Sequence, residues 1–364
     1  PSPTPTPTGT PAIALSAANY SVPENGNQVT VTLTRLGDPA GIASVKYASS
    51  DSAGLNNCNV VNGIASSRCD YAAVVGLVTF ASGESLKTIS IPLVDDAYAE
   101  GNESFTLSLS NATGAGLGNV STATITINDN EVVNGSNPIE VTAFFVREHY
   151  IDFLGREPDP AGYTGWQNVI NNCASGDTSC DRIHVSGAFY QSPEFQERGY
   201  FVYRFYSVSF GRKPDYAEFL PDFARVSGFL SNQQLEGARV AFVADFIARP
   251  AFATKYDGLS NAQFVETLVA TAGVTLTVKQ DLIDALNNGT KTRAQVLREI
   301  VEHAVVTQKF FNQAFVVMQY FGYLRRDPDA AYLNWIQELN SSGNARTMIN
   351  GFVNSLEYRA RFGN

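Results

Sequence analysis

The chain has 364 residues, of which 44% are hydrophobic and 16% charged, and its formal net charge is −10. This is the composition of a globular protein with two or three domains, and the acidic balance without any Lys/Arg run argues against a nucleic-acid partner. No stretch approaches the roughly 18 consecutive apolar residues of a membrane-spanning helix. The sequence starts at Pro1 without a charged-then-apolar leader, so we expect a mature or trimmed product.

The first residues form a low-complexity segment rich in Pro and Thr, PSPTPTPTGTP. Such a sequence favours an extended, polyproline-like backbone. We therefore expect an extended tail over residues 1–12. It is either a linker or glycosylated spacer, or a segment that lies against another surface such as a neighbouring copy of the protein.

From about residue 13 to residue 131, apolar and polar residues alternate in short runs separated by Gly, Asn, Asp and Pro. This period of two predicts six or seven strands of an antiparallel β-sandwich. The clearest runs are 29–34, 44–47, 77–80, 88–93, 104–109 and 123–127. The glycine-rich run 114–118 falls between two of these strands, which predicts a hairpin turn rather than a phosphate-binding loop.

Motifs of this region resemble the Calx-beta domain family over about residues 14–131. They are SVPEN at 21–25, DY at 70–71, GLVTF at 76–80, IPLVDD at 91–96, EGNESF at 100–105 and IND at 127–129. The resemblance implies a seven-stranded, immunoglobulin-like sandwich that in many members binds calcium at one end. The whole chain is accordingly expected to be a multidomain β + α protein.

Acidic residues outnumber basic ones in this region, and most lie at strand ends. Carboxylates that converge repel one another unless a divalent cation neutralises them, so calcium is the expected cofactor. The resemblance gives as metal ligands Glu24, Asp51, Asp70, Asp95 and Asp96, with Asp129 and Glu100 as second choices. Ala72 and Ala73 stand where other members carry a further acid, which puts one family site in doubt. The alternative is a plain sandwich with solvated acidic loops.

The four cysteines come as two local pairs, Cys58 with Cys69 and Cys173 with Cys180. Local pairs without CxxC spacing predict two small disulfide loops and an oxidising compartment outside the cell. The first pair would close an insertion at 54–68. The histidines, at positions 149, 184 and 303, are scattered, so a Cys/His metal site is not expected.

After a short linker at 132–138, the chain is expected to be almost entirely helical from residue 139 to residue 364. A Phe-Val…Tyr…Arg…Pro-Asp motif occurs at 145–159, 201–215 and 315–329, and a faded copy begins at Phe264. Such self-similarity predicts stacked helical units that bury one another's apolar faces. The expected repeats are 139–199, 200–256, 257–313 and 314–364.

Each copy has the pattern of an amphipathic helix, a stop at Gly155 or its counterpart, and a second helix capped by Asp159 or its counterpart. Ser192 followed by Pro193 predicts another helix start. Capping boxes are expected at Asp215/Glu218, Ser231/Gln234, Ser260/Gln263, Thr277/Gln280 and Thr292/Gln295.

The pieces 145–166 and 192–195, and again 320–335 and 355–358, resemble a domain of unknown function that is widespread in secreted and surface-exposed bacterial proteins. They are distantly similar to the helical linker domain of phycobilisomes. The resemblance implies a cellular location and the company of other proteins rather than an activity.

The chain contains no G-x-S-x-G, H-E-x-x-H or Walker motif, so we expect no catalytic residues and no enzyme. The recurring Arg/Asp pairs are interpreted as helix corners and caps. The aromatic residues Tyr150, Tyr163, Trp166, Tyr206, Tyr320 and Trp335 are expected in the core, or alternatively on a carbohydrate-stacking surface.

The sequence thus predicts a secreted bacterial structural protein, a self-assembling subunit of an extracellular filament, surface layer or adhesive appendage with a calcium-stabilised sandwich. Its partners would be copies of itself, joined through the Pro/Thr tail and the helical repeats. The alternative is a calcium-dependent adhesion module that binds glycans or proteins, and a hydrolase is the least favoured hypothesis.

Overall fold

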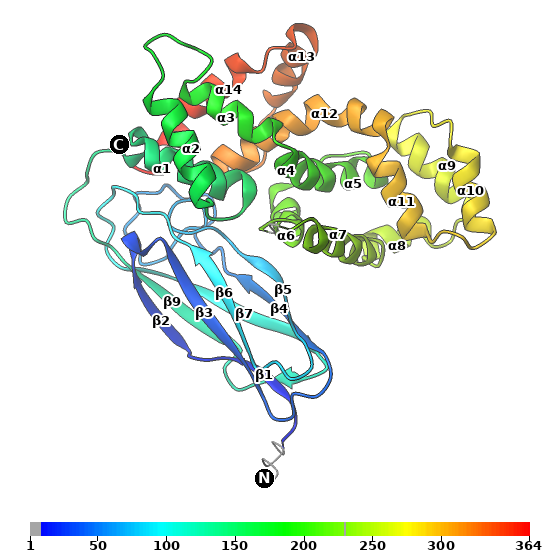
Figure 1. Cartoon of the computed structure of the whole chain (residues 1–364), viewed down its shortest axis with the longest axis horizontal. Helices are drawn as coiled ribbons and strands as arrows, with labels where there is room; N and C mark the ends of the chain where they lie inside the picture. The colour runs from blue at the N-terminus through cyan, green and yellow to red at the C-terminus, as the bar shows by residue number, and fades with distance from the viewer. Residues whose placement is uncertain (1–8, 229–230) are drawn as a thin grey trace. The chain divides into compact units, whose positions relative to one another are not determined.

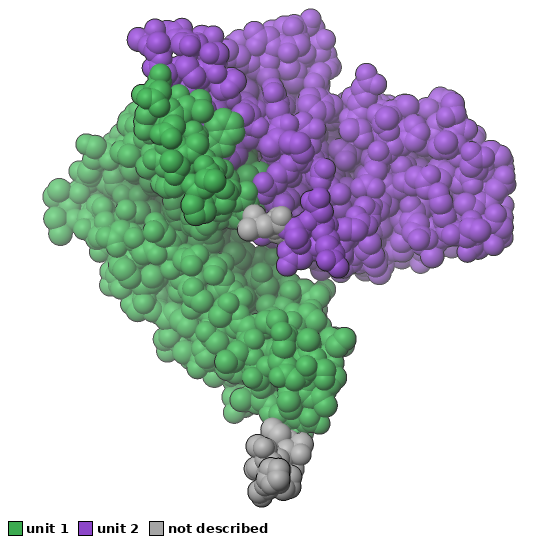
Figure 2. All heavy atoms as spheres, viewed as in Figure 1, with its two compact units in different colours: residues 1–172, 353–364 green, residues 173–352 purple. Residues whose placement is uncertain are grey.

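The computed structural model describes residues 9–228 and 231–364 (Figure 1). Most of the expected Pro/Thr tail, residues 1–8, therefore lies outside the described residues. The chain divides into two compact units (Figure 2). Unit 1 comprises Pro1–Asn172 together with Val353–Asn364, and unit 2 comprises Cys173–Phe352.

Unit 1 begins with a β-sandwich of two sheets, in the strand orders β6-β3-β1-β8 and β2-β9-β7-β4-β5. Pairing is antiparallel except between β1 and β8 and between β2 and β9. The strands are β1 (Ala12–Leu15), β2 (Asn19–Pro23), β3 (Gln28–Leu36), β4 (Ala43–Ser49), β5 (Val75–Phe80), β6 (Leu86–Pro92), β7 (Glu103–Thr113), β8 (Gly116–Leu117) and β9 (Thr122–Asn128). The predicted sandwich is confirmed, and β1, β2 and β8 extend it.

Alternation along the strands builds the core between the sheets. In β3, Val29 and Val31 are buried and lie opposite Ile91 and Ile89 of β6. In the other sheet, every second residue of β7 from Glu103 to Leu109 is buried. Because side chains of period two share one face, Glu103 continues the inward-facing series of β7 at the end of the sandwich.

The remainder of unit 1 is helical. It contains a 3-10 turn (Pro138–Glu140), α1 (Thr142–His149), a π-helical turn (Tyr150–Leu154), α2 (Pro160–Asn171) and, near the C-terminus, α15 (Leu356–Arg359). The helix expected at 145–154 therefore changes its winding at Tyr150 and stops at Gly155, whose φ is 64°. Asp159 caps α2 as predicted, since its Oδ1 accepts a hydrogen bond from Gly162 N at 2.8 Å.

Unit 2 is helical throughout its regular structure. Its helices are α3 (Arg182–Gln191), α4 (Pro193–Phe195), a π-helical turn (Gln196–Tyr200), α5 (Phe201–Phe210), α6 (Tyr216–Val226), α7 (Asn232–Ile247), α8 (Pro250–Tyr256), α9 (Asn261–Ala272), α10 (Lys279–Asn287), α11 (Arg293–Glu302), α12 (Ala304–Gln319), a π-helical turn (Tyr320–Leu324), α13 (Tyr332–Ser342) and α14 (Arg346–Val353). Helix α5 is central, because residues 201–209 are all buried. Phe205 packs on Phe242 and Phe246 of α7.

Most of the predicted helix starts are confirmed. Ser192 Oγ accepts from Phe195 N at 3.1 Å, and capping boxes are present at Asp215/Glu218, Ser260/Gln263 and Thr292/Gln295. The box predicted at Thr277/Gln280 is wrong. Residues 276–279 form a turn closed by Lys279 N and Leu276 O, so α10 begins only at Lys279 and has no side-chain cap.

Among the residues described, none of the helices has both the length and the apolar character that a membrane span requires.

Candidate metal centre

Acidic side chains from four segments meet at one end of the sandwich. Glu24 opens the 3-10 turn after β2, Asp70 lies in the segment before β5, the loop between β6 and β7 carries further acids, and others follow β9. We call this set the acidic pole; its members are Glu24, Asp70, Asp95, Asp96, Glu100, Glu103, Asp129 and Glu131.

Two groups of three carboxylates form within the acidic pole. In each group, one oxygen from every member lies within 4.8 Å of the others. The first group is Glu24, Asp95 and Glu131, and the second is Asp70, Glu100 and Glu103. The second group is fully buried, whereas the first is only partly so.

Asp96 interacts electrostatically with members of both groups and is 4% exposed. Its backbone N–H donates to Glu24 Oε1 at 3.2 Å, and its Oδ1 accepts from Tyr98 N at 2.7 Å. Its other oxygen, Oδ2, is buried without a hydrogen-bond partner, and so are Asp95 Oδ1 and Glu131 Oε2. A buried carboxylate oxygen without a partner is costly, so these atoms require a ligand or a proton.

Asp129 has a different environment. Its carboxylate accepts backbone hydrogen bonds from Glu100 N (2.8 Å), Gly101 N (2.6 Å) and Glu131 N (2.7 Å). Although burial acts in the opposite direction, these donors lower the pKa of Asp129. Asp129 therefore stays charged and fixes the loops that carry its neighbours.

The pKa values of the other acids are displaced upward. Burial, reinforced by the nearby carboxylates, raises the pKa of Glu24 to about 8 and that of Glu100 to about 9. Burial and then repulsion from Asp70 raise the pKa of Asp96 well above its ordinary range. Burial, followed by the neighbouring Asp129 and Asp95 carboxylates, raises the pKa of Glu131 to about 7. Without a counter-ion, the pole therefore holds protons at neutral pH.

The oxygen-only ligand set matches the preference of hard divalent cations. Ca²⁺ takes 6–8 oxygen ligands at flexible angles, and carboxylates are its commonest protein ligands. Zn²⁺ prefers nitrogen and sulfur, which the pole does not offer in its two groups. The partnerless oxygens on Asp95, Asp96 and Glu131 therefore fit a bound Ca²⁺ ion.

Of the seven acids expected from the sequence, the structure brings six together in the acidic pole. Asp51 is exposed and belongs to neither group of three. Glu103 and Glu131 were not expected. Glu103 occupies an inward position of β7, where the alternating pattern was the available signal, and Glu131 lies just beyond the IND motif.

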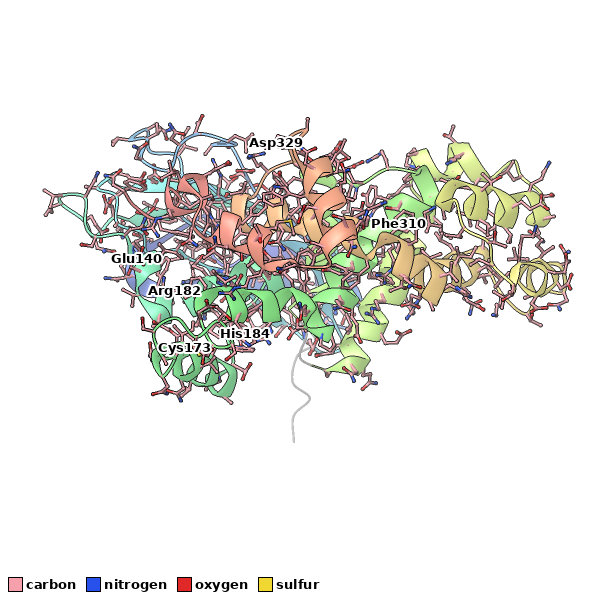
Figure 3. The ribbon with its side chains drawn as sticks, turned by 90° about the horizontal axis from the view of Figure 1, so that it is seen from above. Glu140, Cys173, Arg182, His184, Phe310 and Asp329 are labelled. Atoms are coloured by element: carbon pink, nitrogen blue, oxygen red, sulfur yellow. A yellow bond between two sulfur atoms is a disulfide. The ribbon has the colours of Figure 1, made fainter. Side chains whose placement is uncertain are left out.

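Both predicted disulfides are present. Cys58–Cys69 closes the insertion next to Asp70, and Cys173–Cys180 closes the loop before α3, where Figure 3 labels Cys173, Arg182 and His184. Cys173, Asp177 and Cys180 also lie close enough to suit a metal ion. Because both sulfurs are bonded to each other, they are not thiolate ligands.

The repeated Arg and Asp residues make local contacts at the helix corners. Arg156 lies 3.7 Å from Asp159 and over the Tyr150 ring, and Arg326 lies 3.4 Å from Asp329. Asp329 does not cap α13 directly, because its Oδ1 accepts from Ala331 N in the turn before that helix. These contacts are those of a structural corner.

The histidines do not form a site together. Nδ1 of the fully buried His149 donates to Phe145 O at 2.8 Å, one turn earlier in α1, and the ring packs beside Phe145. His303 caps α12 by accepting from Val305 N. Both therefore have local structural roles.

The fold and the site define a β-sandwich with an acidic pole that is joined to a helical region. Residues 8–131 match the family described as the Calx-beta domain, and residues 135–199 match the family described as Domain of unknown function (DUF4214). The chain therefore combines a Calx-beta domain with a DUF4214 domain. The DUF4214 match covers the first expected repeat, and the later repeat boundaries stay a prediction.

One curated protein, the extracellular matrix organizing protein FRAS1 of Mus musculus, is 33% identical over 124 residues, or 33% of this chain. The chain spans only 3% of the length of that relative. The crystal structure of the apo-form Calx CBD1 domain is 27% identical and covers 34% of this chain and 100% of its own, with a TM-score of 0.29. That of calcium binding domain CBD12 of CALX1.1 is 28% identical and covers 32% and 45%, with a TM-score of 0.28.

Proposed function

We propose that the acidic pole binds Ca²⁺ and that the Calx-beta domain is a calcium-stabilised module. The observation that carries this proposal is the set of buried, partnerless carboxylate oxygens on Asp95, Asp96 and Glu131. Without a cation these oxygens need protons, and the raised pKa values of Asp95, Asp96 and Glu131, caused first by burial, reflect that need. A divalent cation satisfies them while the carboxylates are charged.

Each group of three carboxylates offers ligand oxygens for one ion, and Asp96 interacts with members of both groups. The first group is more accessible than the second, since Asp95 and Glu131 are half-buried. Mg²⁺ is a poorer candidate than Ca²⁺, because it retains several of its waters and demands near-octahedral geometry. Buried, crowded carboxylates suit the larger and more tolerant ion.

Isothermal titration of the full chain with CaCl₂ tests this proposal. We expect saturable binding with a Kd around 10⁻⁴–10⁻³ M, the range of extracellular calcium modules. MgCl₂ in the same cell serves as the control and should bind more weakly. Identical titrations of CaCl₂ into protein and into buffer alone would contradict the proposal.

We further propose that the protein is an extracellular structural subunit of a bacterial surface, filament or adhesive layer that assembles with copies of itself. Support comes from the two disulfides, which belong to oxidising compartments. The printed name of the mouse relative, an extracellular matrix organizing protein, describes a role of the same kind. Stacked helical units also offer long lateral surfaces for contacts between copies.

Negative-stain microscopy of the purified protein, with and without calcium, tests self-assembly. We expect ordered filaments or sheets whose abundance depends on calcium. Isolated monomers at every calcium and protein concentration would contradict this role while leaving calcium binding intact.

The second candidate is a calcium-dependent adhesion module for glycans or proteins. Two helices favour it, because Tyr163 and Trp166 of α2, and Tyr332 and Trp335 of α13, are only half-buried at a spacing of three residues. Aromatic faces of this kind stack on sugar rings. Binding on a glycan array that is lost both in Asp95→Ala and in Trp166→Ala would favour this function over assembly.

A further inference from the structure

The last residues of the chain return to the sandwich within unit 1. Arg361 is fully buried, and its Nε donates to Arg68 O at 2.8 Å. Phe362 O accepts from Ala97 N at 2.9 Å. We refer to residues 355–363 as the C-terminal segment; these two hydrogen bonds join it to two separate loops of the sandwich.

Two further contacts strengthen the same attachment. The Tyr98 hydroxyl donates to Ala360 O at 3.2 Å. Arg68 NH2 lies 3.0 Å from Glu357 Oε1, and this ion pair is partly shielded from water. The C-terminal segment thus contacts both the backbone carbonyl and the side chain of Arg68.

The loops that hold the C-terminal segment are also the loops that carry the acidic pole. Arg68 precedes Asp70 by two residues, and Ala97 directly follows Asp96. Val94 N donates to Asp70 O at 2.9 Å, so the two loops are tied to each other. A shift of these carboxylates moves the anchoring points of the C-terminal segment.

The C-terminal segment is also fastened to the helical part of unit 1. The Arg361 guanidinium forms a two-fold hydrogen bond with Asp152 at 2.8 and 3.0 Å. The Asn137 side-chain amide donates to Arg359 O at 2.9 Å and to Gly363 O at 2.8 Å. The segment therefore bridges the sandwich loops and the first helices.

Helix α1 is also hydrogen-bonded to the sandwich, near the loop that carries Asp95 and Asp96. Arg147 donates to Leu93 O at 2.9 Å and to Asn27 O at 2.8 Å. Leu93 stands two residues before Asp95, one of the acids of the pole. Arg147, which joins α1 to the sandwich, thus lies next to the acidic pole and interacts electrostatically with Asp95.

We propose that the C-terminal segment is a latch whose attachment to the sandwich loops is coupled to the binding of a divalent cation at the acidic pole. This inference rests on the proposed calcium function. Without a cation the acidic side chains hold protons or, as the pH rises and they become charged, repel one another, and both states favour loop arrangements that differ from the latched one. A bound cation draws the carboxylates together and holds Arg68 and Ala97 where the C-terminal segment needs them.

Coupling of this kind is reciprocal. If the cation strengthens attachment of the C-terminal segment by a given factor, the attached segment raises the cation affinity by the same factor. Calcium would thereby rigidify the joint between the Calx-beta domain and the first DUF4214 helices.

Hydrogen–deuterium exchange of the full chain in CaCl₂ and in EDTA tests the latch. The Ala360 and Phe362 amides donate within the C-terminal segment, to Leu356 O and Arg359 O. We expect their exchange to slow by about fivefold or more in calcium, the lower end of typical coupling factors. The amides of α10, in unit 2, serve as the internal reference and should not change.

The Glu357→Gln variant tests the reverse direction. It removes the ion pair with Arg68 without touching the acidic pole, and Glu357 is exposed enough for the variant to fold. We expect its calcium Kd to rise about twofold to fivefold, in line with one partly exposed ion pair. Glu236→Gln, which breaks the comparable pair with Arg298 in unit 2, is the matched control and should leave the Kd unchanged.

The outcomes separate the two proposals. Calcium binding that leaves the exchange of residues 355–363 unchanged, or an unchanged Kd in Glu357→Gln, would refute the latch and leave the calcium module standing. Absence of calcium binding in the unmodified chain would refute the proposed function and the latch with it.

Discussion

Asp96 shows how single residues set the properties of the acidic pole. Its carboxyl group is buried, its Oδ2 is without a partner, and its carboxylate is repelled by Asp70, Glu24 and Glu100. A residue in this position weakens the fold when the pole is empty of cations and supports the fold when a cation is bound. The two effects have opposite signs and can be separated by one substitution.

We predict that Asp96→Asn melts at the same temperature as the unmodified chain, or slightly higher, in EDTA. In EDTA the raised pKa keeps the Asp96 carboxyl group protonated, and Asn is a neutral side chain of nearly the same shape. The same variant should lose most of the stabilisation by calcium. Thermal melts in EDTA and in calcium provide both readouts. Asp51→Asn, at an exposed acid outside the two groups, is the control, and an equal loss of calcium response there would contradict the assignment.

The raised pKa values predict an unusual dependence of stability on pH. The pKa values of Glu131, Glu24 and Glu100 rise from an ordinary 4.5 to about 7, 8 and 9, mainly through burial. Between pH 4.5 and 9 the folded chain therefore binds more protons than the unfolded chain, so stability falls as the pH rises. In EDTA the melting temperature should decrease from pH 6 to pH 9.

Calcium should weaken or abolish this decrease, because it binds the deprotonated carboxylates and its affinity rises with pH. Thermal melts at pH 6, 7, 8 and 9, with and without calcium, provide the measurement. A melting temperature in EDTA that rises steadily over this range would contradict the buried, protonated state of the pole.

For single residues, the sequence predicts those members of the acidic pole that belong to short acidic motifs. It does not predict members that lie outside such a motif. Asp95 and Asp96 stand in the IPLVDD motif and do lie in the pole. Glu103 was missed because an inward position within a strand is normally apolar. Only the three-dimensional structure shows that this inward position lies at the end of the sandwich, next to the other acids. Asp51 follows β4 in the sequence, yet its loop takes it away from the two groups.

At the scale of the elements, the corner between α1 and α2 depends on backbone conformation. Gly155 ends the π-helical turn with a φ of 64°, a region that costs residues with a Cβ about 1–2 kcal/mol. Gly165 lies inside α2, and a Cβ there would meet no atom within 4 Å. The two glycines therefore have opposite predicted responses to the same substitution.

We predict that Gly155→Ala lowers the free energy of unfolding by about 1–2 kcal/mol. Gly165→Ala should raise it by up to about 1 kcal/mol, since Ala is the better helix former. Urea unfolding followed by circular dichroism measures both. Equal effects of the two substitutions would show that the corner does not require the left-handed conformation.

The two disulfides allow a matched comparison between loops. Cys58–Cys69 closes a loop that is followed directly by Asp70, whereas Cys173–Cys180 closes a loop of unit 2. Replacing either pair by serine should cost about 2–4 kcal/mol of stability. Only the first replacement should also reduce the increase in melting temperature that calcium produces. Equal reductions in both double variants would show that the first loop does not position Asp70.

The elements themselves were largely predictable, because strand alternation and capping residues are local signals. The π-helical turns were not, since they require one additional residue per turn that no propensity marks. In the third copy, Arg325 adopts the left-handed conformation, with a φ of 48°, at the position that Gly155 and Gly211 occupy in the first two. All three copies therefore end this helix with a residue in the left-handed conformation, although the third copy has Arg in place of Gly.

For the whole molecule, the order of a sandwich followed by a helical region follows directly from the change of period near residue 132. The return of the C-terminal segment to unit 1 does not, because it depends on contacts such as Arg361 with Asp152 between residues far apart in the chain. Pattern analysis along the chain detects local periodicity and cannot rank such long-range pairings.

The most direct measurement is the melting temperature of the full chain in millimolar CaCl₂, in MgCl₂ and in EDTA. A cation that binds only the folded state at a hundredfold excess over its Kd adds about 2.7 kcal/mol to the free energy of unfolding. We predict a calcium-specific increase of several degrees in the transition of the sandwich. Identical melting curves in calcium and in EDTA would contradict the proposal that calcium binds the acidic pole and stabilises the sandwich.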